Sequence, residues 1–219
     1  MSKDFVVFDV IPAGVDTEKV LTQLGYPREA CLPPKLWEKV EVQKAETLRL
    51  IEPKGAYLLL EGAGQKGFEL FWEAEGIVLA LVTIGSAIER RAKELTNTEQ
   101  AAAGLIVDAI GTVAAEQTAD FLESKIRQDC AGWGWKVSRR YAPGYCGWGI
   151  EGQKEIFNRF PYTIGIELTS SCLMIPEKSL SFACLLSSKG NFDKIKLGDC
   201  KRCRQKDCPY RLEVYKTES

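Results

Sequence analysis

Short apolar runs, separated by polar and glycine-rich stretches, dominate the first third of the chain. The runs whose length and β-branched or aromatic content predict strands are residues 5–11, 56–61, 68–72 and 77–84. Apolar positions at helical spacing predict a short helix over residues 16–24 and a longer one over 34–51, which ends before Pro53. This part of the chain therefore combines strands with helices.

Helical spacing dominates the middle of the chain. It predicts a charged helix over residues 86–95 and a long helix over 99–128, whose first half is rich in Ala and Gly. Tight core packing explains most of these small residues, although they also let a backbone lie close to a ligand. A helix over 150–160 and two strands, 163–173 and 179–187, follow. Together the patterns predict an α+β fold in which a mixed or antiparallel sheet packs against long helices.

The 219 residues suit one globular domain or two small ones. We expect residues 1–80 to form an N-terminal α/β part packed on the main domain. Residues 81–190 are expected to form the core, and residues 191–219 a small Cys-rich tail.

Residues 62–67 spell Gly-Ala-Gly-Gln-Lys-Gly, formally the spacing of a dinucleotide-binding loop. Such a loop must open a helix, because the pyrophosphate binds at the helix N-terminus. The next predicted element here is a strand, so we favour a hairpin loop.

Charge is balanced, with 29 Lys and Arg against 30 Asp and Glu, which argues against disorder and against nucleic acid as a partner. The chain contains no His, which excludes His general bases, Ser/His or Cys/His nucleophile pairs and zinc sites that need imidazole. The N-terminus lacks the apolar core of a signal peptide, and no uncharged apolar run reaches the ~18 residues of a membrane span. We therefore expect a cytoplasmic protein without a membrane partner.

Residues 140–145, Arg-Tyr-Ala-Pro-Gly-Tyr, combine side chains that suit a small-molecule loop. Arg offers a rigid fork for a carboxylate, Pro fixes a backbone torsion, Gly lets a ligand approach the backbone, and Tyr supplies a flat face with a polar tip. Taken alone, these features are better explained by a structural turn.

Three motifs that follow one another between residues 80 and 186 resemble the activation domain of cobalamin-dependent methionine synthase. The family's R-x-x-P-G-Y hallmark is matched by Arg140, Pro143, Gly144 and Tyr145. Residues 165–171 (GIELTSS) and 174–181 (MIPEKSLS) match the patterns that follow the hallmark, and residues 107–116 look like a helix that carries an acidic ligand contact. The fused enzyme has an acidic residue shortly before the hallmark Arg, whereas residues 134–139 contain no Asp or Glu.

The resemblance implies a free-standing reactivation factor that binds S-adenosylmethionine and supports reductive methylation of a corrinoid. The corrinoid would belong to a cobalamin-dependent methionine synthase or a related corrinoid methyltransferase, to which this protein would be accessory. The methyl group leaves a sulfonium and the nucleophile is reduced cobalt on the partner, so positioning the donor is sufficient. The implied partners are thus a corrinoid-binding methyltransferase module and a reductase or other low-potential electron donor.

The resemblance also implies roles for single residues. Arg140 would hold the ligand's carboxylate, Tyr145 would line the pocket, and Glu116 would accept hydrogen bonds from the ribose or the ammonium group. The complete set of expected ligand-binding residues is Glu116, Arg140, Ala142, Pro143, Gly144, Tyr145 and Gly147.

Cys200, Cys203 and Cys208 lie within nine residues, a density that core packing does not need. Three thiolates make an incomplete metal site, and without His the fourth ligand would be another Cys, an Asp, a water or a ligand atom. Cys146, beside the hallmark turn, is the favoured choice. An iron–sulfur cluster is favoured, while zinc and unligated or redox-paired thiols remain open. The remaining thiols, which we expect to be buried packing residues, are Cys31, Cys130, Cys172 and Cys184.

Two other functions remain open. The chain could bind S-adenosylmethionine or a corrinoid protein without turnover. It could also be an iron–sulfur electron carrier in which the ligand pocket is vestigial. A metal centre in the tail would suit an electron carrier and a reactivation factor equally.

Overall fold

The computed structural model describes residues 5–26, 34–145, 147–190 and 192. Its main sheet is antiparallel throughout, in the order β1–β2–β3–β7–β4. The strands are β1 (Phe5–Phe8), β2 (Lys54–Glu61), β3 (Gly76–Thr83), β4 (Lys136–Tyr141) and β7 (Ser179–Ser187). A second, two-stranded sheet pairs β5 (Glu167–Leu168) with β6 (Met174–Ile175). The expected α+β class with an antiparallel sheet is confirmed.

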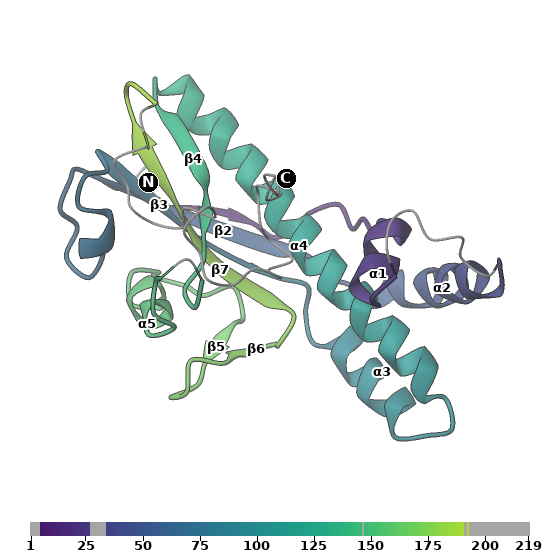
Figure 1. Ribbon diagram of the computed structural model, residues 1–219. Coiled ribbons are helices and arrows are strands. Elements are labelled where there is room, and N and C mark those ends of the chain that lie inside the picture. The colour runs from purple at the N-terminus through teal and green to yellow at the C-terminus, as the bar shows by residue number, and fades with distance from the viewer. Residues whose placement is uncertain (1–4, 27–33, 146, 191, 193–219) are drawn as a thin grey trace, which may run out of the picture.

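Helices cover both faces of this sheet. They are α1 (Thr17–Gln23), α2 (Pro34–Thr47), α3 (Ala87–Thr96), α4 (Ala101–Gly132) and α5 (Gly152–Phe157), with 3₁₀ turns η1 (Leu48–Leu50) and η2 (Glu69–Phe71). Figure 1 shows α4 running along one face of the sheet, while α5 and the β5–β6 hairpin lie on the other side. Helices α1, α2 and α3 all contact α4. In the described ranges, no helix combines the length and the apolar composition that crossing a membrane requires.

The alternation of side chains along β7 separates two core layers. Phe182, Cys184 and Leu186 pack with α4, whereas Ala183 and Leu185 pack on the opposite face, in the same cluster as residues of α5. The central strand β3 is buried at all eight positions, because it has a strand on each side and a core layer on each face. Burial on both faces explains why the sequence of β3 is apolar without alternation.

The strands formed by the first 80 residues, β1, β2 and the first part of β3, belong to the same sheet as β7 and β4. Strand β3 pairs with β7 along its whole length, from Gly76 opposite Leu186 to Thr83 opposite Ser179. The division predicted near residue 80 therefore falls inside β3. The predicted Cys-rich tail lies outside the described residues, apart from Phe192, which packs against the core on the α5 side.

The 3₁₀ turn η2 (Glu69–Phe71) occupies most of residues 68–72, so the strand predicted there is wrong. Phe68 and Phe71 lie one 3₁₀ turn apart, and both rings contact Trp148, at centroid distances of 6.3 and 4.9 Å. The glycine-rich residues 62–67 still lie in a connection between two antiparallel neighbours, β2 and β3, as a hairpin loop requires.

Two further elements differ from the prediction. Only Glu167–Leu168 forms a strand within the strand predicted over 163–173, because the chain turns back after Leu168 to pair β5 with β6. In this turn the Thr169 N–H donates to the Leu173 carbonyl at 2.9 Å, and Cys172 has a φ angle of 63°, in the left-handed region. Strand β4 was not predicted at all. It is an edge strand whose sequence, KVSRRY, lacks the apolar alternation of the inner strands.

Candidate functional site

The hallmark Arg140 extends from β4 to α4, where it meets three carboxylates. Its Nη2 donates to Glu116 Oε2 at 2.7 Å, and its Nη1 donates to Asp120 Oδ1 at 2.7 Å and to Glu123 Oε2 at 3.3 Å. Spacings of four and three residues place the three carboxylates on one face of the helix. The structure thus brings together Arg140 and Glu116, both expected from the sequence. It adds Asp120 and Glu123, which the sequence analysis did not single out.

This cluster is partly shielded from water. The side chains of Arg140 and Glu116 are 26% and 25% exposed, and the guanidinium lies 5.8 Å from the ring of Phe182. Burial by itself would lower the pKa of Arg140. The hydrogen bond to Asp120 and the charges of the three carboxylates outweigh burial and raise that pKa, so the guanidinium keeps its charge.

Two of the three carboxylates have a second cation nearby. Asp120 Oδ2 lies 3.5 Å from Lys19 Nζ, and Glu123 Oε1 lies 2.6 Å from Arg127 Nη2. Glu116 has no second cation among the described residues. Among the described residues, Arg140 is thus the one cation that forms an ion pair with Glu116.

A β-bulge in β4 directs Arg140 toward α4. Val137 pairs with Leu186 and Arg140 pairs with Cys184, so β4 carries one residue more than β7 between these two pairs. Because strand side chains alternate between faces, the extra residue reverses the alternation. Val137 and Arg140 consequently both lie on the α4 side, and Tyr141 points to the opposite layer.

Hydrogen bonds of Ser138 and Arg127 hold the bulge. The hydroxyl of Ser138 accepts from the Leu185 N–H at 2.9 Å and donates to the Arg139 carbonyl at 2.6 Å. From α4, Arg127 donates to the carbonyls of Val137 and Ser138 at 2.6 and 2.7 Å. The backbone groups at the bulge that form no hydrogen bond between the strands are thus hydrogen-bonded to the side chains of Ser138 and Arg127.

The hallmark turn follows directly after β4. The Tyr145 N–H donates to the Ala142 carbonyl at 3.2 Å, and the Gly144 N–H donates to the Trp148 carbonyl at 2.7 Å. Gly144 and Gly147 have φ angles of 89° and 83°, which glycine adopts without a steric penalty. Pro143 is buried and Gly144 is exposed, and Tyr145 is 51% exposed.

Trp148 holds this turn in place, because its carbonyl accepts the hydrogen bond of the Gly144 N–H and its ring is buried. The sequence analysis did not identify Trp148 as part of the site. Its ring is 7% exposed and packs edge-on against Phe71 and Phe68. Gly152 faces the indole so closely that a Cβ there would lie 2.6 Å from Trp148 Cε2. Only glycine fits at this position of α5.

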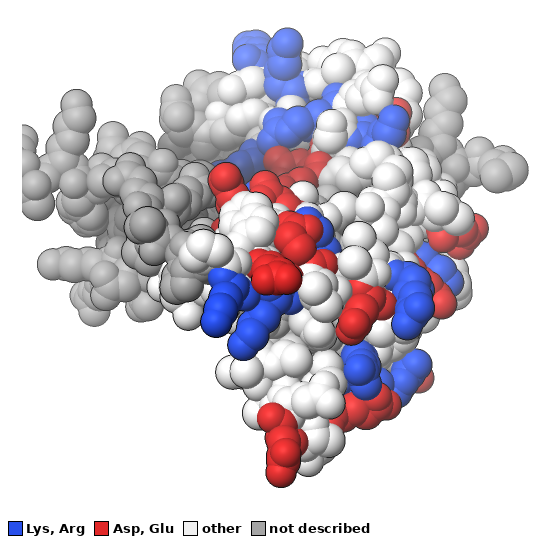
Figure 2. Space-filling model, turned by 90° about the vertical axis from the view of Figure 1, so that its right-hand side faces the viewer, with Lys and Arg blue, Asp and Glu red and all other residues white. Residues whose placement is uncertain are grey.

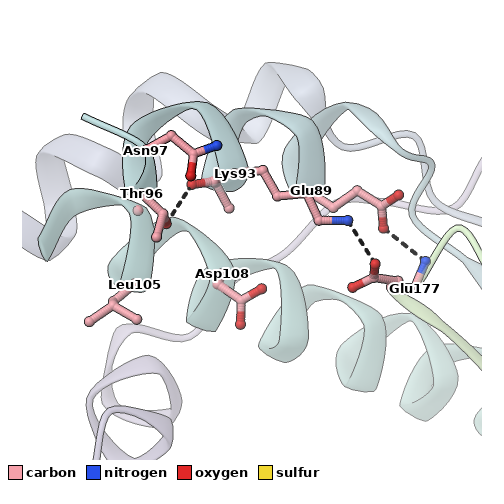
Figure 3. Close-up of a pocket in the computed structure, with 9 residues that line it drawn as sticks. Glu89, Lys93, Thr96, Asn97, Leu105, Asp108 and Glu177 are labelled. Atoms are coloured by element: carbon pink, nitrogen blue, oxygen red, sulfur yellow. Dashed lines mark hydrogen bonds and ion pairs between the residues drawn. The ribbon is translucent and has the colours of Figure 1, made fainter. Parts of the chain in front are cut away.

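A separate pocket of about 200 Å³ lies between α3 and α4 (Figure 3). Lys93 Nζ donates to Glu177 Oε1 at 2.7 Å, and the Glu177 N–H donates to Glu89 Oε2 at 2.8 Å. The pocket is smaller than typical ligand sites. None of the ligand-binding residues expected from the sequence lines it. Asp108, on its wall, is eight residues from Glu116, or about 12 Å along the helix.

The expected metal ligands Cys146, Cys200, Cys203 and Cys208 lie outside the described residues, as does Cys31. Within the described residues, no group of three or more metal-ligating side chains is arranged to hold a metal. Cys130, Cys172 and Cys184 are free and buried, as expected for packing residues. Burial raises the pKa of Cys130 to about 11, so its thiol is neutral.

The face that carries α1, α2 and α3 is shown in Figure 2, where basic and acidic side chains are interspersed among uncharged ones. Some of these charges pair within one helix, as Lys44 does with Glu41 and Arg91 with Glu94, and others pair between elements, as Lys93 does with Glu177. This face therefore has the mixed charge of an ordinary solvated surface.

No family model and no curated protein matches the sequence. Among solved structures, the chain is similar to the crystal structure of the MetH reactivation domain bound to AdoHcy, with a TM-score of 0.59. The superposition covers 78% of this chain and 73% of that chain, at 15% sequence identity. At 15% sequence identity, the structural similarity shows a common fold and nothing more. We conclude that the chain has the fold of the MetH reactivation domain.

Proposed function

We propose that this chain binds S-adenosylmethionine beside Arg140 and Glu116 and serves as a reactivation factor for a corrinoid methyltransferase. One observation carries the proposal. Arg140 and Glu116, the two charged residues implied by the motif resemblance, form an ion pair of 2.7 Å between β4 and α4. The fold match supports it further, because the matching MetH domain was crystallised with AdoHcy.

The charges of this pair complement the amino-acid end of the ligand, which carries a carboxylate and an ammonium group. A guanidinium has five N–H donors. Three of those of Arg140 reach the carboxylates of α4, so two remain without a hydrogen bond to a described residue. Those two suit the ligand's carboxylate. Glu116 uses only Oε2 toward Arg140, which leaves Oε1 for the ammonium group.

The hallmark turn would supply the remaining contacts. Gly144 has no side chain between its backbone and solvent, so a ligand can approach the peptide groups. The exposed part of the Tyr145 ring offers a flat surface for packing. Ala142, Pro143 and Gly147 set the course of the turn.

The partner's reduced corrinoid would supply the nucleophile, with an electron from a low-potential donor. The residues of this chain then need only bind the methyl donor and orient its sulfonium outward. A reactivation factor of this kind should show no methyl transfer by itself.

Binding calorimetry with S-adenosylmethionine tests the site. Glu116→Gln should weaken binding about tenfold, equal to ~1.4 kcal/mol, because the amide cannot neutralise the ammonium group. Asp120→Asn is the matched control: that carboxylate is 51% exposed and already faces Lys19, so the affinity should change less than about threefold. An undetectable affinity of the unaltered protein would refute the proposal, and equal affinities for all three proteins would remove Glu116 from the site.

Methyl transfer to a corrinoid protein tests the reaction. Methylation of the corrinoid should require this chain, S-adenosylmethionine and a low-potential reductant together, and each omission should abolish it. Tight binding without any transfer would favour a binding module without turnover. Methylation of a small acceptor without corrinoid would contradict the reactivation role.

A further inference from the structure

Lys178, in the connection between β6 and β7, is held against α4 by two polar partners. Its Nζ lies 2.8 Å from Asp108 Oδ1 and donates to Thr112 Oγ1 at 2.9 Å. The Thr112 hydroxyl itself donates to the Asp108 carbonyl at 3.2 Å, so its oxygen accepts from Lys178. The Lys178 side chain is only 14% exposed. Lysine side chains are rarely this far from water unless paired, so the two contacts fix how Lys178 and α4 lie relative to each other.

Gly111 provides the space for the apolar stem of Lys178. A Cβ at Gly111 would lie 3.3 Å from Lys178 Cε and 3.4 Å from Lys178 Cγ, so the stem packs directly on the surface of α4. Beyond this contact the ammonium group reaches both Asp108 and Thr112. The helix therefore matches the apolar stem and the charged end of the same side chain, which distinguishes this contact from a solvated surface ion pair.

The preceding residue, Glu177, joins the same connection to α3 instead. Its Oε1 accepts from Lys93 Nζ at 2.7 Å, and its N–H donates to Glu89 Oε2 at 2.8 Å. The side chains of Lys93 and Glu177 are 63% and 62% exposed, and ion pairs this exposed contribute little to stability. Of the two neighbouring ion pairs, that of Lys178 is thus the more buried one and the one that constrains α4.

Thr112, which Lys178 contacts, lies one helical turn before Glu116. Four residues advance an α-helix by about 6 Å and rotate it about 40° past a full turn, so the two side chains share nearly the same face of α4. Arg140 donates to Glu116 Oε2 at 2.7 Å on that face. Lys178 and Arg140, which come from different segments, therefore contact successive turns of α4. The first contact influences where the second carboxylate lies.

We infer that Lys178 is a positioning residue for the amino-acid end of S-adenosylmethionine, an inference that rests on the proposed function. By fixing α4 at Asp108 and Thr112, Lys178 holds Glu116 where one carboxylate oxygen contacts Arg140 and the other meets the ligand's ammonium group. A shift of about 1 Å at Glu116 is enough to weaken such a contact strongly. Lys178 acts through the helix and touches no ligand atom.

Lys178→Met tests this role, because methionine keeps an apolar stem over Gly111 and removes the ammonium group. In calorimetry it should weaken S-adenosylmethionine binding about threefold to tenfold. Methylthioadenosine carries the base and ribose but no amino acid, so its affinity should change less than about twofold. Lys178→Arg keeps the positive charge and should restore part of the lost affinity. Lys93→Met, which breaks the neighbouring ion pair to α3, is the matched control and should change neither affinity.

A double variant shows whether Lys178 acts through Glu116. Once Glu116→Gln has removed the carboxylate, Lys178→Met should weaken S-adenosylmethionine binding little further, so the two effects should be far from additive. Additive effects would refute the positioning role. If Lys178→Met does not fold, Thr112→Val takes its place, because it removes only the hydroxyl partner and keeps the shape of the side chain.

Two further outcomes would overturn the inference while leaving the proposed function intact. Equal losses of affinity for S-adenosylmethionine and methylthioadenosine in Lys178→Met would indicate a purely structural role. Unaltered S-adenosylmethionine affinity in that variant would show that Glu116 keeps its position without Lys178. If the unaltered protein binds no S-adenosylmethionine, the proposed function itself fails.

Discussion

Arg140 shows how one side chain can stabilise a group of charges that would otherwise repel one another. Glu116, Asp120 and Glu123 lie on one face of α4, and like charges at this spacing destabilise a helix. The Arg140 guanidinium contacts all three carboxylates. Lys19 adds a positive charge beside Asp120, and Arg127 adds one beside Glu123. The contacts of Arg140 join β4 to α4 and leave about a quarter of the Arg140 and Glu116 side chains exposed to solvent.

Tyr57 makes a comparable connection between β2 and α4 and leads to a pH prediction. Its hydroxyl donates to Asp129 Oδ2 at 2.7 Å. Burial, followed by the hydrogen bond and charge of Asp129, raises the pKa of Tyr57 above its ordinary value. The folded pKa of Tyr57 exceeds the unfolded value of ~10. The contribution of its protonated hydroxyl to the free energy of unfolding is therefore fully present below pH ~10 and is lost as pH rises through the folded pKa.

We expect Tyr57→Phe to lower the free energy of unfolding by about 1 kcal/mol at pH 7, through loss of the hydrogen bond. Above pH ~10 the stability of the variant should fall less steeply than that of the unaltered protein, because Phe has no proton to lose. Urea unfolding at pH 7 and at pH 10.5 measures both effects. Parallel pH profiles for the two proteins would contradict the assignment to Tyr57.

At the scale of elements, the bulge in β4 decides what the hallmark can contact. One additional residue between the pairs Val137–Leu186 and Arg140–Cys184 places Arg140 on the α4 side. A regular strand would have directed it to the layer that contains Tyr141. The position of the proposed ligand site therefore depends on an irregularity of an edge strand.

Ser138→Ala should disturb this bulge. It leaves the Leu185 N–H without its partner in a buried position, so we expect a loss of about 2 kcal/mol in the free energy of unfolding. Affinity for S-adenosylmethionine should also fall, because the bulge sets the direction of Arg140. Chemical unfolding and calorimetry provide the measurements.

Ser170→Ala, at an exposed turn position, is the control and should change stability by less than ~0.5 kcal/mol. Unaltered stability in Ser138→Ala would show that another group replaces its hydroxyl. Unaltered affinity would separate the bulge from ligand binding.

At the scale of the whole molecule, the two core layers and α4 form a domain that includes every described residue of the proposed ligand site. Cys200, Cys203 and Cys208 lie outside the described residues, so a shared metal centre stays a prediction from their spacing. If they hold one metal, each single Ser substitution should release it to a similar extent, because an open site loses its metal. S-adenosylmethionine binding should change much less.

Metal analysis of the anaerobically purified full chain, together with calorimetry, measures both quantities. Full metal content in all three variants, or loss in only one of them, would contradict a shared centre. An iron–sulfur cluster used for electron transfer predicts in addition that the variants support methyl transfer only with a strong chemical reductant.

The amino-acid sequence by itself determined the elements whose periodicity is strong. The long helix α4, the charged α3 and the strands β2, β3 and β7 follow from local apolar spacing, which reflects the face or faces that each element buries. The motif resemblance further brought Arg140 and Glu116 together as site residues, although they lie far apart in the chain.

Only the tertiary structure decided the remaining features, because they depend on contacts between distant segments. The 3₁₀ turn η2 forms where Phe68 and Phe71 meet Trp148, and no local pattern contains that contact. Strand β4 is polar and paired on one side, so it has no periodicity to detect. The bulge that places Arg140 against Asp120 and Glu123 depends on the register between β4 and β7, which is set by the packing of both strands on α4.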